Sequence, residues 1–311
     1  MTSAVFVPRT AAASWTDEVL PGLSPAELPV AGRPFVDYAL EAAGRFGVDF
    51  ADAWDARWSP RLAVRLGERL TGQRDGLCDI AYNRIREVPR GLRDLERTAT
   101  FREQSGKGPV IVLWGLALPL YQPGETSYVP VTEKETLLTP VGVYHFDGDR
   151  WLRPSVSPFT VNDTASWLEL SLWLLSGSGA YTLPGYSAEK GVHICRNVVT
   201  ERGVRIEPPA LLCDDSWCAR NARLRRVVVG RGAFVGEAAR LSNTVVGDET
   251  MVGEGLELNG KIVMGGRVID AATGTWVDVE DDGMASRVRR APAWMRAIGR
   301  FLAGASRGRR P

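Results

Sequence analysis

The sequence predicts an α/β domain, then a parallel β-helix, then a basic C-terminal helix. Three observations predict this order. Strand-like and helix-like segments alternate over residues 1–180, a six-residue repeat begins near Gly191, and the chain from Arg287 onward is rich in arginine and has no acidic residue. Alternating elements favour a largely parallel sheet, and a hexapeptide period is typical of a parallel β-helix. We therefore divide the chain into residues 1–180, 190–280 and 285–311.

The elements of the α/β domain follow from short apolar segments. Ala4–Val7 predicts a buried strand, and Phe35–Ala43 has the spacing of an amphipathic helix. Residues 61–70 predict a second helix. The β-branched and bulky run Pro109–Trp114 predicts a strand buried on both faces. A polar N-capping run precedes a predicted helix over residues 165–175.

Two apolar runs, 141–146 and 150–152, flank the sequence Asp147-Gly148-Asp149. Asp-Gly between apolar runs predicts a tight hairpin turn, because glycine tolerates the positive φ that such turns require. A metal site at the two aspartates is the alternative. No third ligand lies nearby in the sequence, so we predict the turn and no metal site.

The six-residue repeat predicts the β-helix. Small or β-branched residues tend to stand four places after each repeating position, where they relieve crowding at the corners of a coil. About 65 residues at eighteen per coil give three to four coils. The repeat slips by one residue after Leu224 and again after Leu241. The repeating aliphatic or small apolar positions are Ile194, Ile206, Leu212, Cys218, Leu224, Val229, Val235, Leu241, Val246, Val252 and Leu258.

Composition excludes several classes of function. A net charge of +1 gives no overall attraction to nucleic acid, so we expect no nucleic-acid partner. The four cysteines form no CxxC pair and the chain has only two histidines, His145 and His193, which argues against a zinc site. Free thiols suit a reducing cytoplasm. The N-terminus has neither a basic n-region nor a long apolar run, so we predict a cytoplasmic location.

The basic tail, residues 285–311, has an amphipathic pattern. Apolar residues at Trp294, Ile298, Phe301 and Leu302 would share one helix face, with arginines on the other. Such a helix could lie at the inner face of the membrane and make a peripheral contact there. The alternatives are a helix packed on the body of the protein and a frayed basic end.

Several of these segments resemble the sugar-1-phosphate nucleotidyltransferase family. Pro29, Val30, Gly32, Arg33 and Pro34 match the stretch that leads into the first helix of that family. Val141–Tyr144 resembles the strand that lines its sugar pocket. A helix leading into hexapeptide repeats is similar to the mannose-1-phosphate guanylyltransferase-like members, which carry a left-handed β-helix. The resemblance implies a Rossmann-like (GT-A-like) first domain.

The residues that this family uses for catalysis are missing from the matching positions. No glycine precedes Gly22, although the family has a Gly-rich loop after its first strand. The family's lysine matches Pro25. Its magnesium-binding aspartate matches the stretch Leu113–Leu116, and no carboxylate follows before Glu125. We therefore predict no catalytic residue and no metal ligand, and Mg²⁺ as a cofactor only if the chain is active.

The remaining site candidates are binding residues. The resemblance implies that Arg9, Gly32, Arg33, Gly142 and Tyr144 contact a nucleotide sugar or sugar phosphate. Arginine is an adequate phosphate binder, but Arg9 and Arg33 could equally be solvated or loop-tethering residues.

Three functions stay open. The first is a non-catalytic binding or scaffold subunit in nucleotide-sugar or exopolysaccharide biosynthesis, and the second is an active NDP-sugar pyrophosphorylase. The third is acyl transfer by the β-helix, which usually needs a histidine base between coils. His193 precedes the first clean coil and His145 lies in the other domain, which disfavours that function. A β-helix also favours stacking against a second copy, so we expect a homo-oligomer.

Overall fold

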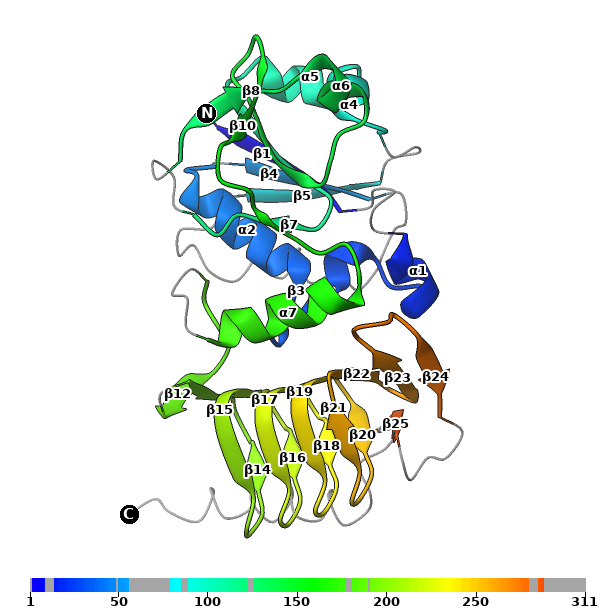
Figure 1. The fold of residues 1–311 in the computed structure, drawn as a ribbon. Helices are drawn as coiled ribbons and strands as arrows, with labels where there is room; N and C mark the ends of the chain where they lie inside the picture. Colours follow the sequence, from blue (N-terminus) through cyan, green and yellow to red (C-terminus); the bar gives the residue numbers. More distant parts are fainter. Residues whose placement is uncertain are drawn as a thin grey trace, which may run out of the picture. The chain divides into compact units, whose positions relative to one another are not determined.

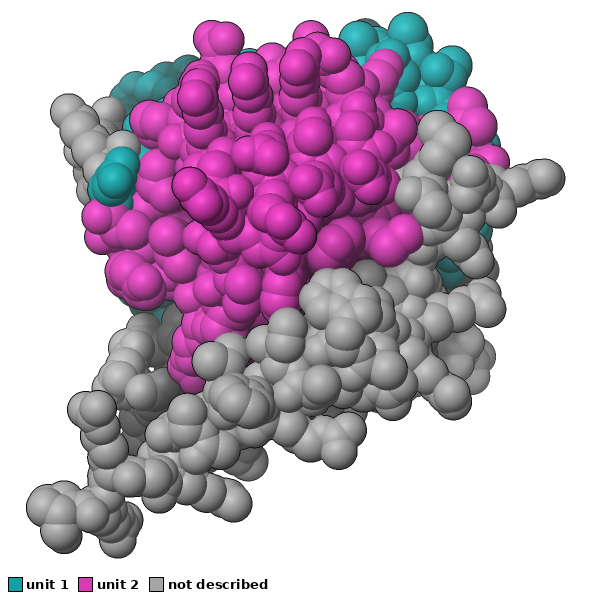
Figure 2. All heavy atoms as spheres, turned by 90° about the horizontal axis from the view of Figure 1, so that it is seen from below, with its two compact units in different colours: residues 1–184, 189–191, 269–276 teal, residues 185–188, 192–268, 277–311 magenta. Residues whose placement is uncertain are grey.

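The computed structural model describes residues 2–8, 14–48, 50–55, 79–84, 89–121, 126–176, 181–189, 191–279 and 285–287. The chain divides into two compact units, which Figure 2 distinguishes by colour. The N-terminal unit comprises Met1–Pro184, Glu189–Gly191 and Ile269–Trp276. The C-terminal unit comprises Gly185–Ala188, Val192–Val268 and Val277–Pro311.

A seven-stranded mixed sheet organises the N-terminal unit (Figure 1). Its order is β5 (Asp79–Arg84), β4 (Phe50–Asp55), β1 (Ser3–Val7), β6 (Val110–Trp114), β9 (Gly142–Phe146), β10 (Trp151–Pro154) and β8 (Tyr128–Pro130). The first four strands are mutually parallel, and each pairing from β6 to β8 is antiparallel. The expectation of a largely parallel sheet is therefore corrected to a sheet in which half of the pairings are antiparallel, because β9 runs opposite to β6 and a hairpin joins β9 to β10.

Helices cover both faces of this sheet (Figure 1). On one face, α4 (Leu92–Glu96) and α5 (Ala99–Ser105) contribute Leu92, Leu95 and Phe101 to a core with Val5, Val112 and Trp114. On the other, Phe35 of α2 (Phe35–Arg45) stacks on Phe6 with ring centroids 6.0 Å apart. The short elements of this unit are α1 (Trp15–Val19), η2 (Pro25–Glu27), β2 (Pro29–Val30), β3 (Arg33–Pro34), β7 (Ala117–Leu118), α6 (Glu133–Leu137) and β11 (Phe159–Thr160).

The predicted elements of this unit that fall on described residues are confirmed. Strands β1 and β6 are buried along their whole length. The Asp147–Asp149 turn joins β9 to β10, and the Asp147 carboxylate accepts hydrogen bonds from the Asp149 and Arg150 amides. Helix α7 (Thr164–Leu175) begins after Asp163, whose side chain caps the Ser166 amide at 2.7 Å. The helix predicted over residues 61–70 lies outside the described residues.

The C-terminal unit is a parallel β-helix, as the repeat predicts. One strand of each coil joins the sheet β14 (Val199–Thr200), β16 (Trp217–Cys218), β18 (Phe234–Val235) and β20 (Thr250–Val252), so there are about four coils. The two units confirm the predicted order of an α/β domain followed by a parallel β-helix. The other strands are β12 (Tyr186–Glu189), β13 (Val192–Ile194), β15 (Arg205–Leu212), β17 (Arg223–Val229), β19 (Arg240–Val246), β21 (Glu257–Asn259), β22 (Lys261–Met264), β23 (Arg267–Asp270) and β24 (Trp276–Asp278).

The one-residue slips of the repeat are changes in coil length. Val199 pairs with Trp217 eighteen residues on, whereas Trp217 pairs with Phe234 and Phe234 with Met251 at seventeen. The shortening occurs at one corner, where the single residue Arg226 stands opposite the pair Pro208-Pro209 of the preceding coil. The three corners of the coils repeat a left-handed backbone conformation, which Asn, Asp and Gly adopt most easily. The first corner has Asn197, Asp215, Gly232 and Glu249 in successive coils, and the second has Gly203, Asn221, Ala238 and Gly255. The third corner has Arg226, Asn243 and Gly260.

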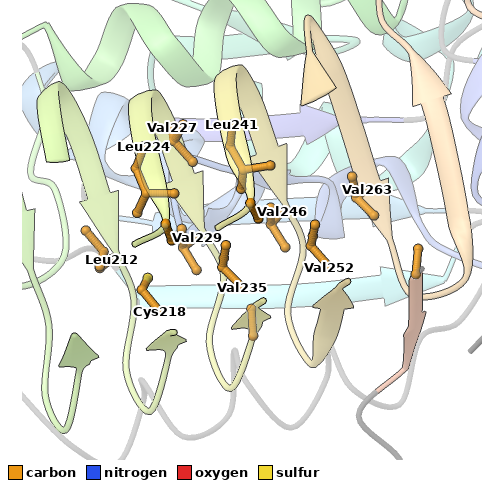
Figure 3. Close-up of a cluster of buried hydrophobic side chains, with 14 residues drawn as sticks. Leu212, Cys218, Leu224, Val227, Val229, Val235, Leu241, Val246, Val252 and Val263 are labelled. Atoms are coloured by element: carbon orange, nitrogen blue, oxygen red, sulfur yellow. The ribbon is translucent and has the colours of Figure 1, made fainter. Parts of the chain in front are cut away.

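The predicted inward positions form the core of the β-helix. Figure 3 shows Leu224 and Leu241, and then Val229 and Val246, repeating from coil to coil. Val235 and Val246 are fully buried, and Ala233 and Ala239 are buried beside them. The predicted register of the repeat is therefore confirmed.

The described chain ends in β25 (Ala285–Arg287), which pairs antiparallel with β20. The first three residues of the segment predicted as a tail thus belong to the β-helix, because Ala285 fills its core. The rest of the tail, with the predicted amphipathic helix, lies outside the described residues. Within the described ranges, no helix combines the length and the apolarity that crossing a membrane requires.

Candidate functional site

The strand order of the mixed sheet points to one edge as the candidate site. From β1 the chain continues to β4 and β5 on one side, and it returns to β6 on the other. In open α/β sheets, ligands bind outside the carboxyl ends of the parallel strands at the place where the strand order reverses. Here that place lies between β1 and β6, where the Gly115 amide donates to the Val7 carbonyl at 2.8 Å. Because β9 is antiparallel and Gly142 pairs with Trp114, Gly142 starts at the same edge.

Two charged residues that sequence reasoning missed end strands at this edge. Asp55 is the last residue of β4 and Arg84 is the last residue of β5, and the two are register partners. Neither strand was predicted. The alternation over Phe50–Asp55 was the available signal, but the two aspartates Asp52 and Asp55 obscured it. The segments that follow β1, β4 and β5 (residues 9–13, 56–78 and 85–88) lie outside the described residues, and Arg9 is among them.

The end of β6 does not fit a magnesium ion. Trp114 is 2% exposed, Leu116 is fully buried, and Gly115 between them has no side chain. The Trp114 ring belongs to the core cluster that also holds Val7 and Tyr144. In the part of the chain that the structure describes, no three His, Cys, Asp or Glu side chains gather as metal ligands would. Mg²⁺ needs oxygen ligands, which these side chains do not supply.

Gly32 lies in a two-residue hairpin turn, and Arg33 follows it as the first residue of β3. The turn joins β2 to β3, with Val30 opposite Arg33, and both Ala31 (φ 41°) and Gly32 (φ 75°) have positive φ. This is the turn geometry that glycine favours. Neighbouring helices hold the hairpin, because Trp167 donates to the Pro29 carbonyl at 2.7 Å and Tyr38 donates to the Ala31 carbonyl at 3.3 Å.

The Arg33 guanidinium ties this hairpin to neighbouring segments. It donates to the Glu41 carboxylate at 2.8 Å and to the Thr182 carbonyl at 2.6 Å, and it lies 4.5 Å from the centre of the Tyr38 ring. The Thr182 amide also donates to Glu41, at 2.8 Å. Burial by itself raises the pKa of Glu41, but hydrogen bonds from Arg33 and the Thr182 amide outweigh it and leave that pKa lowered. The structure therefore favours the loop-tethering role for Arg33.

Gly142 and Tyr144 lie together in β9 of the seven-stranded sheet, whereas Arg33 belongs to the separate two-stranded sheet β2–β3. The Tyr144 hydroxyl donates to the Pro140 carbonyl at 2.8 Å, and its ring belongs to the same core cluster as Trp114. A Cβ atom on Gly142 would lie 3.3 Å from that ring, so glycine leaves room for it. Tyr144 is 3% exposed, and burial raises the pKa of its hydroxyl. The Tyr144 side chain therefore packs in the core. Gly142 is the member of this pair that lies at the candidate edge.

A second polar group on the sheet was also missed. His145 contacts Tyr128 and Phe46, with ring centroids 4.5 and 5.5 Å apart, and Tyr121 contacts Phe46 at 6.2 Å. The His145 Nε2 atom and the Tyr121 hydroxyl are buried and make no hydrogen bond with any residue that the structure describes. Burial lowers the pKa of His145 to about 4. The side chain is neutral at physiological pH and contributes as an aromatic ring.

No protein-family model matches the sequence, and no curated protein does. Among solved structures, a UDP-glucose pyrophosphorylase complexed with UDP-glucose is similar to this chain at 16% identity and a TM-score of 0.29. The match covers 44% of this chain and spans half the length of that one (50%). A likeness at this level carries no argument about activity or ligand. The fold assignment rests on the strand order of the mixed sheet and on the coil register of the β-helix.

Proposed function

We propose that this chain is a non-catalytic nucleotidyltransferase-like protein that binds a nucleotide sugar or sugar phosphate. It would act as a binding or scaffold subunit in nucleotide-sugar or exopolysaccharide biosynthesis. The sheet offers a ligand edge where β1 and β6 meet, and the resemblance of Pro29–Pro34 and Val141–Tyr144 to the family supplies the ligand class. A homo-oligomer through the β-helix and a contact of the tail with the membrane surface stay predictions.

The residues at the end of β6 are the main support for proposing that the chain is not catalytic. Nucleotidyl transfer joins a sugar-phosphate oxygen to the α-phosphorus of a nucleoside triphosphate and breaks the bond to pyrophosphate. Charge on the phosphoryl oxygens must be neutralised by a metal ion, basic side chains or backbone amides. Where the family has its metal carboxylate, this chain has the buried residues Trp114 and Leu116 and the intervening Gly115. A carboxylate at either of these buried positions would have to replace a side chain of the core.

Binding without transfer asks less of the site. A phosphate group can be held by arginine and by backbone amides at the strand ends. Strand β5 ends at Arg84 and β4 ends at Asp55, so the register places a basic and an acidic residue at adjacent strand ends of this edge. Because Arg33 is held by Glu41 and Thr182, we assign it to the scaffold.

The test has two arms. Pyrophosphate release is measured over a panel of nucleoside triphosphates and sugar 1-phosphates, with and without Mg²⁺, and binding of GDP-mannose and UDP-glucose is measured by calorimetry. We expect binding and no turnover. Mg²⁺-dependent turnover near 1 s⁻¹, the low end of ordinary enzymes, would overturn the non-catalytic proposal. Absence of binding across the panel would overturn the ligand class.

Matched variants locate the binding edge. Arg84→Ala should weaken binding about tenfold, since a charge-assisted hydrogen bond to phosphate contributes about 1.5 kcal/mol or more. Arg102→Ala is the control, because Arg102 lies in α5, which leads into the opposite, amino end of β6. Equal affinities for the two variants would show that the ligand does not bind at the carboxyl edge.

A further inference from the structure

One outer face of the β-helix carries a column of apolar side chains. The last residue of each of the strands β16, β18 and β20 points into the core of the β-helix: Cys218, Val235 and Val252. Side chains alternate along a strand, so the residues before them point outward. These are Trp217, Phe234 and Met251, which are register partners and follow Val199 of β14. All four are half-buried, and the Trp217 indole donates to Glu201 at 3.0 Å. We call Val199, Trp217, Phe234 and Met251 the apolar column.

The corners that border this column change from basic to acidic along its length. On one border Arg202, Arg220, Glu237 and Glu254 stack in register, so the acidic pair lies at the β18–β20 end. Glu237 and Glu254 follow Phe234 and Met251 on one side, and Glu249 precedes Met251 on the other. Glu249 and Glu254 are exposed, and none of the three glutamates makes an ion pair with another described residue. At the β18–β20 end, apolar side chains beside glutamates suit a basic amphipathic segment, whose apolar face would meet the column and whose arginines would meet the glutamates.

The described chain ends beside this column. Strand β25 extends the same sheet, β14-β16-β18-β20-β25, and Ser286 pairs with Met251. After Arg287 come 24 further residues with seven arginines and no acidic residue, among them the apolar positions Trp294, Ile298, Phe301 and Leu302. The tail therefore starts at the edge of the sheet that carries the column, at a high effective concentration.

We infer that the C-terminal segment 292–302 docks on the apolar column of its own β-helix. A helix over these eleven residues would be about 16 Å long. The column crosses four strands that lie about 4.8 Å apart, so it spans about 14 Å. The apolar face of such a helix would cover the column from Met251 toward Val199.

The neighbouring outer face is unsuitable for the same segment. Its register stacks three exposed arginines, Arg205, Arg223 and Arg240, with Arg225 beside them. The acidic residues of that face, Glu207 and Glu257, already pair with Arg225 and Arg240 at 3.7 and 3.9 Å. A basic segment would face like charge there, whereas at the β18–β20 end of the column it would meet glutamates that make no ion pair with the described residues.

Hydrogen–deuterium exchange of the full chain tests the inference. In the parent protein, amides of residues 294–302 should exchange at least about tenfold more slowly than an unstructured segment. Phe234→Asp, which places a charge in the column, should abolish that protection. Arg223→Asp makes a charged substitution on the arginine face and should leave it unchanged. Amides of β17 and β19, read in the same experiment, report whether each variant is folded.

A second pair of variants avoids the column itself. Glu249→Lys with Glu254→Lys reverses charge at exposed border positions and should also reduce the protection. Glu207→Lys with Glu257→Lys makes the same chemical change on the arginine face and should not. The inference is overturned if residues 294–302 exchange freely in the parent, or if protection survives both Phe234→Asp and the border reversal. It is equally overturned if protection appears only at high protein concentration or only with anionic vesicles, since a second copy or a membrane would then be the occupant.

Discussion

Close approach between neighbouring coils makes Gly236 a sensitive position in the β-helix. The β18 strand turns there, and the next coil passes directly beside it. A Cβ atom built on Gly236 would lie 2.6 Å from the Glu254 amide nitrogen and 2.6 Å from the Gly253 carbonyl carbon. Both are backbone atoms, so no side chain can move aside. Gly236→Ala should therefore force the two coils apart.

The size of the effect follows from the cost of overpacking. Inserting a methyl group into a closely packed core costs about 1–3 kcal/mol. Because the clash is with backbone of a parallel coil, we expect the upper part of that range. Gly255→Ala is the matched control. No heavy atom lies within 4 Å of its added Cβ, and the equivalent corner one coil earlier already holds an alanine, Ala238, at φ 55°. Its cost should be about 1 kcal/mol, the penalty of a left-handed alanine.

The assay is urea unfolding of the C-terminal unit, followed by far-ultraviolet circular dichroism and by exchange protection of β17 and β19. Gly236→Ala should lower the free energy of unfolding by at least about 1 kcal/mol more than Gly255→Ala does. If the two variants lose equal stability, or if Gly255→Ala loses more, the coils do not approach as closely at Gly236 as the structure places them.

Three further predictions concern burial and ionisation. Val235→Asp buries a charge in the β-helix core and should cost several kcal/mol, so a soluble, fully folded variant would contradict the register. The pKa of His145 is lowered to about 4 in the folded protein, so the unfolded chain takes up the proton first as the pH falls. Stability should thus decline by up to about 3 kcal/mol between pH 6.5 and 4, and His145→Gln should flatten that decline in a pH series of urea titrations. The pKa of Glu41 is also lowered in the folded protein. The ionised side chain therefore adds to the free energy of unfolding above the ordinary carboxyl pKa, and this contribution is lost as the pH falls through the pKa of the folded state. Glu41→Gln should reduce stability at neutral pH and flatten the acid limb below pH 4.5, where an unchanged limb would refute the role of its hydrogen bonds.

The β-helix could be predicted from the sequence because its signal is repeated. Each coil places an aliphatic residue inward at the same three positions, so an error at one position is corrected by its neighbours in other coils. Even the slips at Arg226 and Asn243 were visible as a change of phase. The repeat did not reveal β25, because that strand is antiparallel to β20 and lies outside the period.

The mixed sheet was predicted less completely because some of its strands are uniformly apolar and others contain charged residues. The uniformly apolar strands β1 and β6 were found, whereas β4 contains two aspartates. Asp52 is only 2% exposed, and it can be buried because Gln104 donates a hydrogen bond to it. A residue 52 positions away in the sequence thus makes Asp52 compatible with a strand, and local pattern cannot show this.

At the candidate site too, the role of a residue depends on contacts with residues far away in the sequence. The hairpin around Ala31 and Gly32 was not predicted, because the sequence there indicates only a stretch that leads into a helix. The sequence left two roles open for Arg33, and the contact that favours the tethering role, with Thr182, joins residues 149 positions apart. Local sequence could therefore not say whether this arginine faces a ligand or the protein.

The packing at the end of β6 leaves no place for a metal carboxylate. Trp114 contributes its ring to the core beside Val7 and Tyr144, and the glycine at position 142 leaves space for the Tyr144 ring. A carboxylate introduced at Trp114 or Leu116 would be buried without a partner, which costs several kcal/mol. It would also leave a cavity where a large side chain had been. Packing at positions 114 and 116 and a metal carboxylate at either position therefore exclude each other, and one substitution there could not create a metal site without loosening the core.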